Sequence, residues 1–89
     1  METLAGVPLN LTASGAVKNT PGMLVGVVVN SHTSGTLKFW NNTAGSGTVL
    51  FNTITLAAGE RWIPLFNANF NVACFLTIGG TVDCTVIYK

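Results

Sequence analysis

Turn-forming residues divide this sequence into short apolar runs, and their spacing constrains the fold more than any other feature. The segments NTPG, NSHTSG, NNTAGSG, AAGE, NAN and GGT recur at intervals of roughly 8 to 12 residues. The runs between them are rich in Val, Ile, Thr and Phe, which favour strands, whereas the helix formers Glu and Lys are scarce. The pattern predicts an all-β sandwich or barrel with strands at 15–18, 22–30, 36–40, 48–56, 61–66, 70–78 and 82–88.

The last two runs predict a hairpin with a three-residue loop at 79–81. Side-chain alternation places one apolar set on a single face of each strand. The first set is Phe70, Val72, Cys74, Leu76 and Ile78, and the second is Val82, Cys84, Val86 and Tyr88. A three-residue loop keeps both sets on the same side of the hairpin. This register pairs Cys84 with Leu76, so it disfavours a disulfide, and we expect both cysteines to be buried thiols.

Two runs, 23–29 and 62–66, are apolar on both faces of the expected strands. A small antiparallel sandwich has one interior, so some of these side chains must face outward. A contiguous exposed apolar patch usually marks an interface between chains. We therefore predict a subunit interface formed by Met23, Val25, Val27, Trp62, Pro64 and Phe66.

Residues 1–13 differ from the domain that we expect at 14–89. Leu4, Val7, Leu9 and Leu11 alternate with Gly6, Pro8 and Asn10, which is typical of an extended arm. Such an arm can lie in a groove or add a strand to the sheet of a neighbour. The alternative is a frayed or locally packed first strand.

The charge content excludes several classes of function. Charged residues make up 8% of the 89 residues, with four basic and three acidic side chains and a net charge of +1. No basic cluster is present to follow a nucleic-acid backbone. The longest apolar run is about nine residues, whereas a membrane-spanning helix needs about 20. The first residues also lack the pattern of an export signal, so we expect synthesis in a cytoplasm.

Few side chains in this sequence could carry chemistry. The single histidine, His32, and three scattered carboxylates form no catalytic or metal-binding pattern, so we expect neither an enzyme nor a cofactor. Trp40 and Trp62 could stack on sugar rings, although packing is the commoner role of tryptophan. The sequence therefore leaves Trp40 and His32 as candidate ligand-binding residues.

The segments GMLVGVVVNSHTSGTLKFWNNTAGSGTVLFNTITLAAGERWIPL and FLTIGGTVDCTVIYK resemble compact structural proteins of tailed bacteriophages. The resemblance is to head decoration (cement) proteins and related virion modules, and it covers about residues 14–89. It implies a small antiparallel β-sandwich or jelly-roll-like domain of about seven or eight strands, and it supplies no catalytic residue.

The resemblance also implies a location and partners. Decoration proteins sit on the capsid surface as small oligomers, so we expect a homotrimer, with a homodimer as the alternative. They clamp neighbouring subunits of the major capsid protein, commonly through an N-terminal arm. Similar sequence features occur in fibre and tip modules of virions. The alternative function is therefore receptor or carbohydrate binding through Trp40, His32 and the polar loops.

Overall fold

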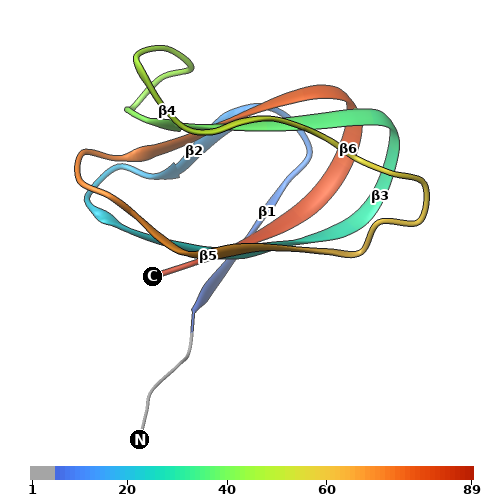
Figure 1. Ribbon diagram of the computed structural model, residues 1–89, viewed down its shortest axis with the longest axis horizontal. Helices are drawn as coiled ribbons and strands as arrows, with labels where there is room; N and C mark the ends of the chain where they lie inside the picture. The colour runs from blue at the N-terminus through green and yellow to red at the C-terminus, as the bar shows by residue number, and fades with distance from the viewer. Residues whose placement is uncertain (1–5) are drawn as a thin grey trace, which may run out of the picture.

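The computed structural model describes residues 6–89 and shows one open sheet of six antiparallel strands, with no helix among these residues (Figure 1). None of the described residues therefore forms a helix that could cross a membrane. The sequence prediction of a small all-β domain is confirmed at this level. The strands are β1 (Val7–Leu11), β2 (Gly15–Lys18), β3 (Gly22–Asn41), β4 (Thr48–Thr55), β5 (Trp62–Phe70) and β6 (Cys74–Tyr88).

The two longest strands, β3 and β6, pair with each other along most of their lengths. This pairing shows that the predicted hairpin at 70–88 is wrong, and so is the predicted break between 30 and 36. The turn-forming residues in these segments bend the strands without reversing them. Thr36 pairs with Gly79, so the two bends lie side by side. The described chain therefore has six strands, not the seven or eight expected.

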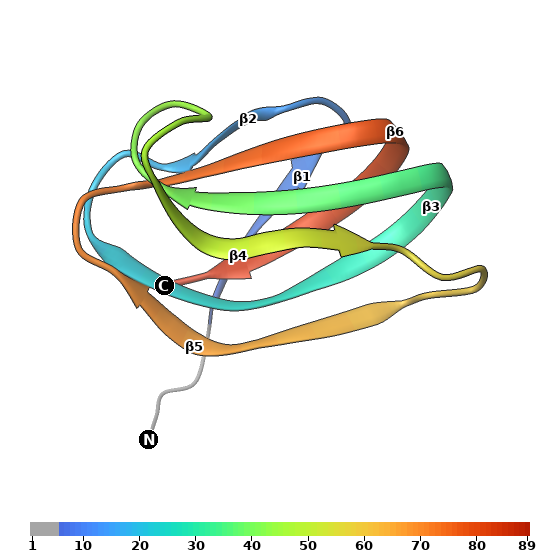
Figure 2. The same ribbon diagram turned by 45° about the horizontal axis from the view of Figure 1, so that its top comes forward.

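The shared bend folds the single sheet into two halves that face each other. In Figure 1, β3 and β6 turn back together on the right of the view, and Figure 2 shows the same path from another angle. The order in the first half is β1-β6-β3-β5, and in the second half it is β2-β6-β3-β4. Each short strand thus pairs with one half of β3 or β6.

Close backbone approach at the bend requires glycine at position 80. Gly80 has a φ of 70°, and a Cβ there would overlap the carbonyl oxygen of Ser34 on the neighbouring strand. Ser34 itself lies in the left-handed region, with a φ of 50°. Glycine adopts a positive φ without steric cost, whereas a residue with a Cβ, such as Ser34, does so at some cost.

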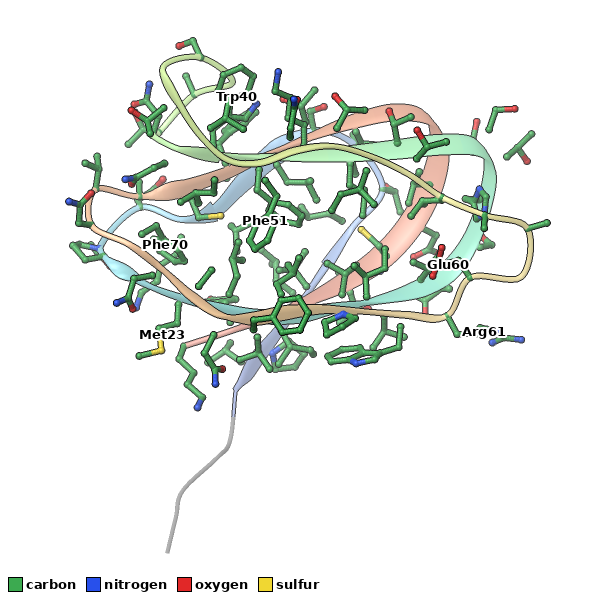
Figure 3. All side chains as sticks on the ribbon, in the orientation of Figure 1. Met23, Trp40, Phe51, Glu60, Arg61 and Phe70 are labelled. Atoms are coloured by element: carbon green, nitrogen blue, oxygen red, sulfur yellow. The ribbon has the colours of Figure 1, made fainter. Side chains whose placement is uncertain are left out.

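Side chains from both halves fill the space between them (Figure 3). Phe39 of β3 packs edge to face against Phe51 of β4, with ring centroids 6.2 Å apart. The fully buried side chains of the core are Leu24, Val27, Val29, Leu37, Phe39, Leu65, Phe70, Cys74, Leu76, Val82, Cys84 and Val86.

The two cysteines are buried and free, as the sequence predicted. Burial raises the pKa of Cys74 to about 12. Burial, together with the nearby negative charge of Asp83, raises the pKa of Cys84 to about 11. Both side chains are therefore neutral, weakly reactive members of the core at neutral pH.

Substituting Gly80 should test the bend, with Gly59 as the matched control. Gly59 also has a positive φ, 79°, but no atom lies within 4 Å of a Cβ built there. We expect Gly59→Ala to lower the free energy of unfolding by about 1 kcal/mol. Gly80→Ala adds the overlap with Ser34 and should cost about 2–4 kcal/mol. Urea denaturation measures both values, and equal losses would contradict the close approach.

The buried thiols should make stability fall at alkaline pH. Below about pH 8.5 the thiols are protonated in both states, so they add no pH dependence. Above that pH the unfolded thiols ionise, whereas the folded ones resist ionisation up to pKa values of about 11 and 12. The free energy of unfolding should therefore decrease as the pH rises from about 8.5 to 11. In a Cys74→Ala/Cys84→Ala variant this slope should be smaller, and an unchanged slope would contradict the assignment.

Candidate interaction surface

An apolar surface covers the outside of the first half of the sheet. Along β3, β5 and β6, side chains alternate between the core and this outside surface. Met23 points away from the interior, as Figure 3 shows, and it is exposed. We call this surface the outer face and define it by Met23, Val28, Trp62, Pro64, Phe66 and Ile87.

Trp62 lies flat on the outer face because Gly26 leaves room for it. A Cβ at Gly26 would overlap the indole ring of Trp62, so the ring rests directly on the backbone of β3. The Trp62 side chain nevertheless remains 46% exposed. The sheet thus presents a flat aromatic surface whose ring is already held in place, which reduces the entropy lost on contact with a partner.

Phe66 projects from a bulge in β5. Gly26 pairs with Pro64 and Leu24 pairs with Ala68, so β5 has extra residues opposite β3 at this point. Phe66 and Asn67 both adopt left-handed backbone conformations, with φ values of 61° and 55°. The Phe66 side chain is 79% exposed. A bulky residue in this conformation is strained, and such strain is concentrated at functional positions.

A polar cluster borders the outer face near the bend. The Nδ2 atoms of Asn10 and Asn30 donate hydrogen bonds to Oδ1 of Asp83, at 2.8 Å and 3.1 Å. These two hydrogen bonds, that of Asn10 first, hold the pKa of Asp83 below its usual value. Asp83 therefore stays ionised in mildly acidic solution. Arg61 precedes β5 and extends sideways at the edge of the molecule (Figure 3), where its backbone pairs with that of the buried Val29.

The six residues predicted to form a subunit interface differ in their exposure to solvent. Met23, Trp62, Pro64 and Phe66 are exposed, and Val25 is half-buried. Val27 is fully buried, so the expectation that it faces outward is wrong. A register shift between Leu24 and Gly26 changes which side chains of β3 face the core. The same shift exposes Val28, which the alternation pattern did not identify. The role of this surface as an interface stays a prediction.

The predicted arm is a strand of its own sheet over the residues that the structure describes. Val7–Leu11 forms β1 and pairs with β6 of the same chain, from Val7 opposite Tyr88 to Leu11 opposite Cys84. Leu9 and Leu11 pack against the core, whereas Val7 is exposed. Leu4 lies outside the described residues. This arrangement matches the alternative of a locally packed first strand, and binding of a capsid subunit by this segment stays a prediction.

The alternative ligand-binding residues, Trp40 and His32, do not form one site. They are eight positions apart on β3, and the bend of this strand lies between them. The indole N–H of Trp40 donates to Oγ1 of Thr77 at 2.9 Å, and Nζ of Lys38 lies 4.5 Å from the ring centroid. The polar group of Trp40 is therefore already satisfied, and Lys38 covers one face of its ring.

Hydrogen bonds of His32 connect the bend of β3 to the segment between β4 and β5. Its Nδ1 accepts a hydrogen bond from the backbone N–H of Gly35, so Nε2 carries the proton and donates to the carbonyl oxygen of Ala57 at 2.8 Å. A surface hollow of about 590 Å³ lies beside it, with Glu60 and Arg61 among its lining residues. Glu60 accepts a hydrogen bond from the N–H of Ala57. Both ring nitrogens of His32 thus serve the fold.

Comparison with known proteins assigns no family to this chain. Neither a family model, nor a curated protein, nor a solved structure matches it. Within residues 6–89, no cluster of His, Cys, Asp and Glu side chains could hold a metal ion. The outer face is therefore the feature from which we infer the function.

Two substitutions at Phe66 should measure the backbone strain. Phe66→Gly and Phe66→Ala both remove the exposed ring, but glycine tolerates a φ of 61° and alanine does not. We expect the glycine variant to have a free energy of unfolding about 1 kcal/mol higher than that of the alanine variant. Equal stabilities in urea denaturation would show that the left-handed conformation stores no strain.

Proposed function

We propose that this chain is a structural, non-enzymatic virion protein that decorates a bacteriophage head. The observation that carries the proposal is the outer face, where Trp62 and Phe66 are 46% and 79% exposed on a sheet surface with few charges. Large aromatic side chains are enriched at the centres of protein interfaces, where charged residues are depleted. The bent sheet is compatible with the small sandwich or jelly-roll-like fold of decoration proteins.

The low charge content suits a protein that holds a shell together. Contacts formed by apolar area depend little on ionic strength, because salt screens charges and has little effect on buried apolar surface. We place the protein on the capsid surface after synthesis in the host cytoplasm. There a homo-oligomer of three or two copies would contact neighbouring subunits of the major capsid protein.

Contact with the capsid would involve the first strand. In the described part of the chain β1 has one neighbour, β6, so it is an edge strand of the sheet. Its exposed Val7 would extend the contact toward a capsid subunit, and Leu4, which also belongs to the predicted arm, lies outside the described residues. Pro8 lacks an N–H, so side-chain contacts should contribute more here than strand addition.

Receptor or carbohydrate binding is the less supported function. It would need the Trp40 ring or His32 to be available for a ligand, whereas both already make hydrogen bonds within the chain. The outer face, in contrast, has large apolar side chains that lack cover in the described structure. We therefore place the contact surface there.

Sedimentation with undecorated capsids of the cognate phage would test the proposal. We expect the wild-type chain to co-sediment in stoichiometric amounts, and Trp62→Ala or Phe66→Ala to lower the affinity by at least about tenfold, as for central interface aromatics. Val72→Ala is the matched control, because Val72 is 52% exposed but lies between β5 and β6. Absence of wild-type binding, or equal losses in all three variants, would contradict the proposal.

A further inference from the structure

We draw no further inference here: the strongest candidate, the apolar outer face around Trp62 and Phe66 on β3, β5 and β6, carries nothing beyond the proposed contact surface, because nothing in the structure shows what covers it.

Discussion

The ladder between β3 and β6 is the interaction on which the other elements depend. Each remaining strand pairs with one of these two, β1 and β2 with β6, and β4 and β5 with β3. The ladder bends where Gly80 passes the backbone of Ser34, and this bend brings the two halves of the sheet together over the core. A change that straightened either strand would therefore expose the core side chains of both halves.

The sequence predicted the composition of much of the core although it predicted the wrong connection in β6. A hairpin with a three-residue loop at 79–81 places Ile78 and Val82 on the same face, and so does a continuous strand, because alternation runs through residue 80. Leu76, Cys84 and Val86 are buried as expected. Side-chain alternation therefore identified the inward residues, but it could not distinguish a reversal from a bend, which depends on pairing with the distant β3.

The residues of the outer face could be predicted only in part, because their orientation also depends on pairing between distant strands. Residues 23–29 are apolar at almost every position, so no polar residue marks which side faces solvent. The bulge between Leu24 and Gly26 then decides that Val27 is buried and Val28 is exposed, and it depends on the pairing of β3 with its two neighbours, β5 and β6. The left-handed backbone at Phe66 had one weak signal in the sequence, the following Asn67, since asparagine tolerates this conformation better than most residues.

The features that make the outer face suitable for contact work against the stability of an isolated chain. Phe66 is held in a strained conformation and gains little from packing, because most of its ring is exposed. Trp62 is fixed against Gly26 while half of its surface still faces water. Covering these rings with another protein would recover apolar surface without reorganising the sheet, since the rings are already in place. Asp83, whose pKa is lowered by its hydrogen bonds to Asn10 and Asn30, keeps its charge in mildly acidic solution at the border of this face. A surface that is low in charge at its centre would bind a partner with an affinity that salt barely affects.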